Sequence, residues 1–287
     1  MTEHLTWVVM PVMAHPEYTE AAISDVLAQT LACKLLVINQ GVDNAFRRRL
    51  EAIAEDSDRM LVWSHQPPLP SLAATWNRAL RFVWDTGATE ALVVNNDIRL
   101  APNALYELSS TMGHTHGGVV TGVGVAAKQF TPGQAVLPIM LTAPDVDGQG
   151  APMEFGGPDF SCFLISRETH EKYPFDEAFV PAYCEDLDLH RRMLLDGNGR
   201  SIFSINVPFL HHGSVTLKSA DEKTRARIEQ QTAAYSRAHY QRKWGGSENH
   251  ELFTRPFDAT SASQGRTTPE LFEEVRRGQT DRRAEAR

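Results

Sequence analysis

The chain alternates between short apolar runs and longer segments in which apolar residues recur at helical spacing. The apolar runs occupy residues 5–10, 35–38, 60–63 and 91–94. Continuous apolar runs of this length are typical of strands buried on both faces of a parallel sheet. Segments with helical spacing lie between them, at residues 18–31, 44–55 and 72–84. This alternation predicts βαβ units with right-handed crossovers, and hence a Rossmann-like half over residues 4–112.

The pattern changes after residue 112. Residues 113–160 are rich in Gly and Pro, with one apolar stretch at 119–125 that predicts a strand. Further strands are predicted at 161–165 and 202–207, a helix from residue 185, and a polar surface helix within 221–244. Residues 251–287 are polar and carry a mixed-charge end. We expect this tail to form a short helix plus disorder, or an oligomer contact.

Composition and charge narrow the class of protein. The 287 residues are 42% hydrophobic and 22% charged, which is typical of a soluble globular chain. The net charge of −8 gives no electrostatic basis for sequence-blind DNA binding. Three widely spaced cysteines without a CxxC pair predict reduced thiols and a cytoplasmic location. A basic leader and an apolar run of about 18 residues are both missing, so we expect neither a signal peptide nor a membrane span.

The first candidate site is Asn95-Asn96-Asp97, directly after the run at residues 91–94. In open α/β sheets, ligands bind at the carboxyl ends of the strands. One carboxylate beside two amides is a suitable partial set for a hard cation whose other ligands are substrate phosphates. The same residues also suit a plain turn at a strand end, so both interpretations stay open.

The second candidate site is the acidic helix start that contains Glu185, Asp186 and Asp188. Acidic residues are favoured there by the helix dipole, and Asp188 can pair with Arg192 one turn later. Repulsion between neighbouring carboxylates can also raise a pKa into the range of a general base. The sequence alone leaves the structural and the catalytic interpretation equally open.

The third candidate site is His211-His212, which follows the predicted strand at 202–207. Adjacent side chains on an extended segment point to opposite sides, so at most one of them faces a given site. An imidazole is compatible with Mn²⁺ and would add a second protein ligand to the cation site at Asp97. A simply hydrogen-bonded histidine is the alternative. The loop at residues 11–17 could hold a nucleotide through its backbone amides, although it has no glycine-rich motif.

Taken in order, these segments resemble a family-2 glycosyltransferase of the GT-A fold. The resemblance covers about residues 6–245. Its motifs are the opening strand and turn at 8–13, the second strand at 36–41, the helix at 72–80, Asn95-Asn96-Asp97 at the DxD position, 163–168 with 174–177, Glu185-Asp186-x-Asp188-Leu189-x-x-Arg192, residues 209–214 and Lys243-Trp244-Gly245. The resemblance implies an α/β fold with one domain over residues 1–250, in which 4–112 bind the nucleotide and 113–250 form the acceptor and catalytic half.

The resemblance also implies the chemistry. A hexosyl or pentosyl group would pass with inversion from a nucleotide-diphosphate donor to an acceptor hydroxyl. Asp97 and His211, with His212 as the alternative, would hold Mn²⁺ or Mg²⁺ on the donor diphosphate. Asp186 would be the general base, with Glu185 and Asp188 as further catalytic residues. The donor-binding residues would be Pro11, Met13, Glu17, Asn39, Asn77, Asn95 and Asn96.

Three positions depart from the family pattern, and each loses a charge. Asn39 stands where an Asp contacts the base, Asn95 replaces the first DxD acid, and Trp76 replaces an Arg. A nucleotide-sugar-binding protein without turnover is therefore one alternative. A second is a transferase whose acceptor is a modified nucleic-acid base or a protein hydroxyl, although the acidic chain disfavours DNA. Metal-dependent phosphoester hydrolysis would need a denser set of ligands near Asp97.

Overall fold

The computed structural model describes residues 6–65, 67–126, 151–152, 160–197, 201–213, 222–274 and 277. The first half follows the predicted alternation of strands and helices. Its elements are β1 (Thr6–Val12), α1 (Pro16–Leu27), β2 (Cys33–Asn39), α2 (Asn44–Glu55), β3 (Met60–Ser64), α3 (Leu72–Asp85) and β4 (Glu90–Val94).

The second half is less regular. Its elements are β5 (Ile98–Arg99), α4 (Ala104–Thr115), β6 (Val119–Ala126), β7 (Ala151–Pro152), β8 (Cys162–Ser166), α5 (Arg167–Lys172), α6 (Glu185–Leu195), β9 (Ser201–His211), α8 (Glu222–Gln231), the π-helix η1 (Thr232–Arg237), α9 (Ala238–Trp244) and the 3₁₀ helix η2 (Ala259–Gln264). The surface helix predicted within 221–244 is thus a continuous helical stretch with a π-helical insert. Most of the Gly- and Pro-rich stretch, at 127–150 and 153–159, lies outside the described residues.

One mixed sheet organises the molecule. Its strand order is β3-β2-β1-β4-β8-β6-β9-β5, and β7 pairs with β9. The strands β3, β2, β1 and β4 run parallel, with Val8 opposite both Leu35 and Leu92. The strand β8 runs antiparallel between β4 and β6. The carboxyl ends of the four parallel strands therefore form one edge, where the loops that follow them gather.

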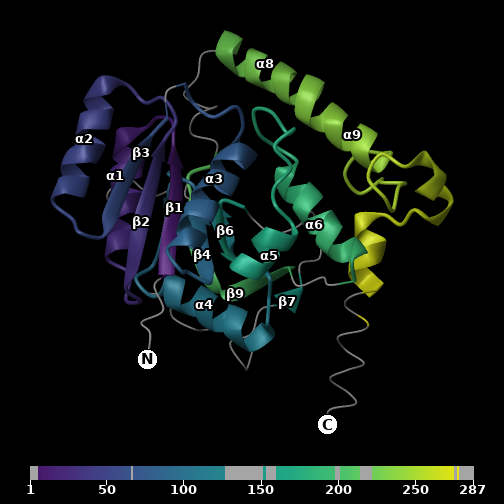
Figure 1. Cartoon of the computed structure of the whole chain (residues 1–287), viewed down its shortest axis with the longest axis horizontal. Helices are drawn as coiled ribbons and strands as arrows, with labels where there is room; N and C mark the ends of the chain where they lie inside the picture. The colour runs from purple at the N-terminus through teal and green to yellow at the C-terminus, as the bar shows by residue number, and fades with distance from the viewer. Residues whose placement is uncertain are drawn as a thin grey trace.

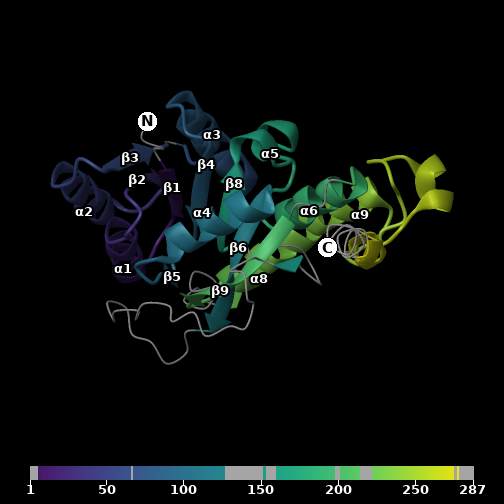
Figure 2. The same ribbon diagram turned by 90° about the horizontal axis from the view of Figure 1, so that it is seen from below.

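Helices cover both faces of this sheet, as Figures 1 and 2 show. On one face, α1, α2 and α4 bury residues such as Ile23, Leu50 and Leu108 against alternate strand residues. On the other face, α3 and α6 bury Trp76 and Leu189 against the intervening strand residues. The parallel strands are apolar on both sides because each side has its own helical layer.

Local sequence explains where several helices begin. The Asp43 side chain accepts a hydrogen bond from the Phe46 amide at 2.8 Å, and the Ser71 hydroxyl accepts one from the Ala74 amide at 3.1 Å. Such N-caps satisfy amides that the first helical turn leaves without a partner. The Ser71 cap lies at the carboxyl edge of the sheet, because α3 starts there after β3. No helix in the described ranges is long and apolar enough to cross a membrane.

The last continuous stretch of helix that the structure describes, up to residue 274, lies on the far side of α6 from the parallel strands (Figure 1). The helices α8 and α9 run as one line past α6, and the following residues fold back beside them (Figure 1). Of the predicted tail, residues 251–274 are described and pack against α6 and α9, through residues such as Leu271 and Phe272. The domain boundary expected at residue 250 stays a prediction.

Candidate active site

Asp97 and His211 lie in contact at the carboxyl edge of the sheet. Asp97 follows β4 by three residues and is 8% exposed. Its Oδ1 lies 3.3 Å from Nε2 of His211, the last residue of β9. The strand β9 reaches this point because its end pairs with β5, with His211 opposite Ile98, and because the His212 amide donates to the Asp97 carbonyl at 3.0 Å. The fold thus joins two residues that are distant in sequence.

The chemistry of this pair fits a divalent cation that the substrate helps to hold. A carboxylate oxygen and a neutral imidazole nitrogen are ligands that Mn²⁺ accepts. Within the described part of the chain, no group of three or more His, Cys, Asp or Glu residues could hold an ion. Two protein ligands leave the remaining coordination positions for phosphate oxygens and water, as is common for cations on nucleotides. The residues therefore fit a cation that arrives with a diphosphate.

His212 points to a different neighbour. Its ring lies edge-on to Tyr18 of α1, with ring centroids 4.6 Å apart, and Tyr18 in turn lies 6.1 Å from His15. His15 adopts a left-handed backbone conformation directly before α1. The two adjacent histidines thus serve different sides, as the extended segment predicts. The sequence did not predict that Tyr18 and His15 lie near His212, because no spacing or motif connects these residues.

Asn96 connects the loop after β4 with the loop after β1. Its Nδ2 donates to the Ala14 carbonyl and to the Thr19 hydroxyl, both at 2.8 Å. Its neighbour Asn95 donates through its backbone amide to the Ser161 carbonyl at 2.8 Å. These bonds hold residues 11–17 beside Asp97. The expected contacts of Asn95 and Asn96 with a donor stay predictions.

The predicted nucleobase-binding residues differ in their environment. Pro11 is half-buried in β1, whereas Met13 is 63% exposed and Glu17 is exposed in the first turn of α1. Asn39 is buried, and its Oδ1 accepts from the amides of Gly41 and Val42, each at 3.0 Å. Its side chain therefore shapes the turn after β2. A nucleobase contact by Met13 or Glu17 agrees with their exposure. The side-chain oxygen of Asn39, in contrast, is already bound to two backbone amides.

Asn77 joins α3 to the segment that leads into α6. Its Nδ2 donates to the Phe175 carbonyl at 2.8 Å, and its Oδ1 accepts from the Phe175 amide and from His170 Nε2, each at 3.0 Å. Burial, and then the charge of Arg81, lowers the pKa of His170 to about 4, so this imidazole is neutral. The arrangement favours an internal role for Asn77 over a diphosphate contact. Trp76, which replaces the family's Arg, is a core residue packed against aromatic rings.

The start of α6 lies at the same sheet edge as Asp97. The amide of Leu72, in the first turn of α3, donates to the Pro181 carbonyl at 2.9 Å, and the Ser71 hydroxyl donates to the Glu177 carbonyl at 3.4 Å. Since α3 begins at the carboxyl edge, residues 177–181 are held there. The helix α6 begins four residues later, at Glu185. The topology therefore brings the acidic helix start and the Asp97–His211 pair to one edge.

The backbone before α6 is strained. Tyr183 and Cys184 have φ angles of 77° and 73°, in the left-handed region that residues with a side chain rarely adopt. Each such residue costs about 1–3 kcal/mol and occurs preferentially at functional sites. In addition, α6 has no side-chain N-cap. Its first turn, with Glu185 and Asp186, is thus held by the surrounding structure and not by a local cap.

Glu185 and Asp186 lie in unlike environments. Glu185 is 4% exposed, and its Oε2 has no hydrogen-bond partner among the described residues. Burial, and then the charge of Asp186, raises the pKa of Glu185 to about 8. Asp186 is half-buried, and its Oδ1 accepts from the Leu187 amide at 2.8 Å. At neutral pH the first turn of α6 therefore combines a protonated acid with a carboxyl group that reaches the surface.

Asp188 is fully enclosed. Its Oδ1 accepts from Lys243 Nζ at 2.7 Å and from the Trp244 indole at 3.0 Å, and its Oδ2 accepts from Arg192 Nε at 2.8 Å. Both carboxylate oxygens are occupied by neighbouring side chains. This geometry favours Asp188 as an anchor between α6 and α9, and its predicted catalytic role has no contact that supports it.

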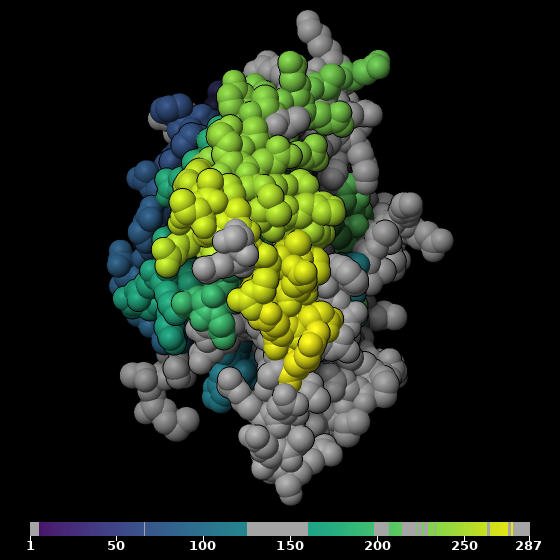
Figure 3. All heavy atoms as spheres, turned by 90° about the vertical axis from the view of Figure 1, so that its right-hand side faces the viewer, coloured from purple at the N-terminus to yellow at the C-terminus, as the bar shows by residue number. Residues whose placement is uncertain are grey.

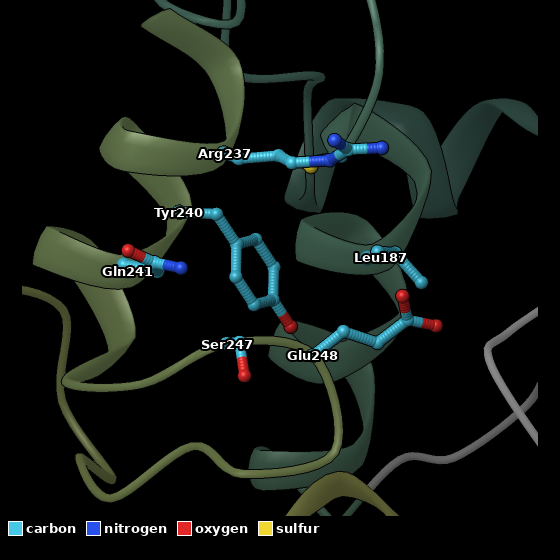
Figure 4. A pocket seen from close by; sticks show the side chains of 7 residues that line it. Leu187, Arg237, Tyr240, Gln241, Ser247 and Glu248 are labelled. Atoms are coloured by element: carbon cyan, nitrogen blue, oxygen red, sulfur yellow. The ribbon is translucent and has the colours of Figure 1, made fainter. Parts of the chain in front are cut away.

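A cavity of about 280 Å³ lies beside the start of α6. Figure 4 shows Arg237, Tyr240 and Gln241 on one side of it and Leu187 on the other. The full lining is Cys184, Leu187, Arg237, Tyr240, Gln241, Ser247 and Glu248. Cys184 and Leu187 are three residues apart and face this cavity together, whereas Glu185 and Asp186 between them are not part of its lining. The sequence did not predict that Arg237, Tyr240, Gln241, Ser247 and Glu248 line a cavity, because their polar pattern is that of an ordinary surface helix.

Known structures share this architecture. The mannosyltransferase PcManGT from Pyrobaculum calidifontis, in complex with GDP-Man and Mn²⁺, aligns with a TM-score of 0.57 at 14% identity, over 83% of this chain and 64% of that one. S. aureus TarS aligns with a TM-score of 0.54 at 14% identity, over 82% of this chain and 43% of that one. Its 1–349 fragment aligns with a TM-score of 0.50 at 13% identity, over 83% and 72% of the two chains. The chain has the GT-A glycosyltransferase fold.

The GT-A fold confirms the α/β architecture that the sequence predicted. At these identities the likeness establishes the fold alone, and the assignment to the inverting family 2 stays a prediction. No protein-family model matches the sequence, and no curated protein matches it.

Proposed function

We propose that this protein is a nucleotide-sugar glycosyltransferase that uses a divalent metal and inverts the configuration of the transferred sugar. The observation that carries the proposal is the contact between Asp97 and His211 at the carboxyl edge of the sheet, the edge at which α6 also begins. Solved structures of the same fold support it, since TarS 1–349 is in complex with UDP and with UDP-GlcNAc, and PcManGT with GDP-Man and Mn²⁺.

The donor diphosphate would lie against Asp97 and His211. Mn²⁺ or Mg²⁺ held there would neutralise the negative charge of the departing diphosphate. Asn96 keeps residues 11–17 next to this point through its bonds to Ala14 and Thr19, so the exposed Met13 and Glu17 would be available to contact the nucleoside. The protein thus orients the donor before the acceptor arrives.

Asp186 would take the proton from the acceptor hydroxyl as its oxygen attacks the anomeric carbon. Attack from the face opposite the diphosphate forms the new C–O bond while the bond to the diphosphate breaks, which inverts the anomeric centre. Glu185 supports this step by staying protonated near pH 7, because burial and the charge of Asp186 raise its pKa. A protonated Glu185 cannot itself accept a proton, so the proton of the acceptor hydroxyl is left to Asp186.

The acceptor would enter through the cavity beside α6. Arg237, Gln241 and Glu248 give this cavity hydrogen-bond donors and acceptors, while Leu187 and the Tyr240 ring give it apolar surface. Such a lining suits a polar compound with several hydroxyl groups. The net charge of −8 argues against a nucleic-acid acceptor, and a glycan or protein hydroxyl agrees better with it.

The test is a thermal-shift screen with UDP, UDP-GlcNAc, GDP and GDP-mannose, each with and without Mn²⁺, followed by an assay for released nucleoside diphosphate. A ligand at 100 times its dissociation constant stabilises the folded state by about 2.7 kcal/mol. We expect stabilisation that requires Mn²⁺, and diphosphate release from the same nucleotide sugar. Stabilisation without any release would favour the nucleotide-sugar-binding protein, which the lost carboxylate at Asn95 would explain. No stabilisation by any of the four compounds would refute both functions.

A further inference from the structure

A fully buried ion pair connects α6 to the last described part of the chain. Arg191 of α6 and Glu251 are both 0% exposed, and Nη1 of the arginine lies 3.6 Å from Oε2 of the glutamate. Glu251 also accepts from the Tyr240 hydroxyl at 2.7 Å and from the Thr268 hydroxyl at 2.9 Å. Burial raises the pKa of Glu251, but these hydrogen bonds and the charge of Arg191 more than offset it, so the carboxylate is ionised.

The same arginine fastens the backbone of residues 251–274, which we name the C-terminal segment. Its Nη2 donates to the carbonyls of Phe253 at 2.6 Å and Arg266 at 2.9 Å, and its Nη1 donates to the Thr268 hydroxyl at 3.2 Å. The guanidinium also lies 5.0 Å from the centre of the Trp244 ring. One side chain of α6 thus contacts four residues of the C-terminal segment, Glu251 included.

Further contacts extend this attachment along α6. Asp188, one turn before Arg191, is bound by Lys243 and Trp244 at the end of α9. One turn after Arg191, Leu194 packs against Leu271 and Phe272 of the C-terminal segment. Residues spaced by three or four share one face of a helix. A whole face of α6 is therefore held by α9 and the C-terminal segment.

The C-terminal segment is itself held in place by close packing and by hydrogen bonds to the end of α9. A Cβ on Gly265 would lie 1.4 Å from the Leu252 carbonyl oxygen, so only glycine allows the chain at residue 265 to approach residue 252 so closely. The amides of Leu252 and Phe253 both donate to the Trp244 carbonyl, at 3.0 and 2.9 Å. Figure 3 shows the C-terminal segment, in yellow, lying directly against the yellow-green residues that precede it.

We propose that the C-terminal segment acts as a brace that positions α6 for catalysis, and that Arg191 and Glu251 are positioning residues of the transferase reaction. The first turn of α6 carries Asp186 but has no side-chain cap and follows two strained residues, so its position depends on contacts that the rest of the helix makes with its surroundings. The brace supplies that constraint from the opposite end of the helix. The inference rests on the proposed function for its catalytic meaning, while its structural part stands independently.

The test compares Glu251→Gln, Arg191→Met and the double variant with a matched control, Leu50→Ala. Breaking one partner of a buried ion pair is strongly destabilising, whereas an apolar replacement of both is tolerated better. Leu50 is buried in α2 on the other face of the sheet, so Leu50→Ala lowers stability without touching α6. Thr268→Val, which removes only the hydroxyl contacts to Arg191 and Glu251, serves if the charge variants do not fold.

Two readouts separate positioning from stability. In donor hydrolysis with UDP-GlcNAc or GDP-mannose, whichever the wild type cleaves faster, we expect Glu251→Gln to lower kcat at least tenfold and to change the donor Kd less than twofold. The double variant should recover part of kcat, and Leu50→Ala should keep kcat within twofold. Equal losses of kcat and donor affinity, or an unchanged kcat in the folded single variants, would overturn the proposal.

Hydrogen exchange tests whether the C-terminal segment holds α6 in place, and it does so even if no donor is cleaved. We expect the amides of residues 185–195 to exchange at least tenfold faster in Glu251→Gln, while those of residues 44–55 keep their protection. In Leu50→Ala the pattern should be reversed. Unchanged protection of residues 185–195, or a uniform loss along the chain, would overturn the brace. A wild-type protein that neither binds nor cleaves any donor would refute the proposed function without affecting this result.

Discussion

Replacing the buried acid at the start of α6 should make the protein more stable. Glu185 is 4% exposed, and burial, followed by the charge of Asp186, raises its pKa from 4.5 to about 8. The folded state therefore keeps a proton that the unfolded chain releases above pH 4.5. Stability is fully present below pH 4.5 and is lost as the pH rises toward 8, because the folded state binds more protons in this window.

The size of the effect follows from the shift in pKa. Each pKa unit corresponds to about 1.36 kcal/mol, so at pH 7, which is 2.5 units above 4.5, Glu185 costs the folded state about 3 kcal/mol. The glutamine of Glu185→Gln has nearly the same shape and does not ionise. We expect this variant to be about 3 kcal/mol more stable than the wild type at pH 7 and equally stable near pH 4.

Urea unfolding at pH 4, 5.5 and 7 measures this difference in the free energy of unfolding. The comparison requires that the slope of that free energy against urea concentration is the same in both proteins. Titrating groups that do not interact with Glu185, such as His170, contribute equally to both proteins and cancel in the difference. Glu55→Gln, at an exposed position of α2, is the matched control and should shift stability by less than about 0.5 kcal/mol. A Glu185→Gln variant that is no more stable at pH 7, or that differs from wild type by the same amount at pH 4, would refute the reasoning.

Three further predictions address the site and its supports. Asp186→Asn should lower transfer by about 10²–10⁴-fold while the donor Kd changes less than twofold, and an equal loss of donor affinity in titrations would contradict the assignment. Asp97→Ala should abolish both activity and the Mn²⁺-dependent thermal shift, whereas wild-type activity that survives chelation by EDTA would exclude the metal. Burial lowers the pKa of His170 from 6.5 to about 4, so its contribution to stability is complete above pH 6.5 and is lost toward pH 4, by about 3 kcal/mol in total. Urea unfolding of His170→Gln should show a weaker loss between pH 6.5 and 4 than the wild type, and an identical loss would contradict this.

The fold could be predicted because the pattern that specifies each strand and helix lies within a short stretch of sequence. Uninterrupted apolar runs separated by segments of helical period are enough to indicate a sheet with helices on both faces. The order of weak motifs along the chain then pointed to the GT-A fold, which the structural neighbours confirm. The π-helix between α8 and α9 and the short strand β5 had no such signal, because a few polar residues satisfy several backbone conformations equally well.

The sequence also singled out Asp97, His211 and Asp186 as chemically capable residues, but only the tertiary structure decided which side chains are available. Asn39, Asn77 and Asp188 have the polar groups that a ligand would need, and the fold uses those groups for the backbone and for neighbouring side chains. A residue type states which hydrogen bonds are possible, whereas the partners come from segments distant in sequence. For the same reason, the cavity beside α6 and the buried ion pair of Arg191 with Glu251 exist only once the chain has folded.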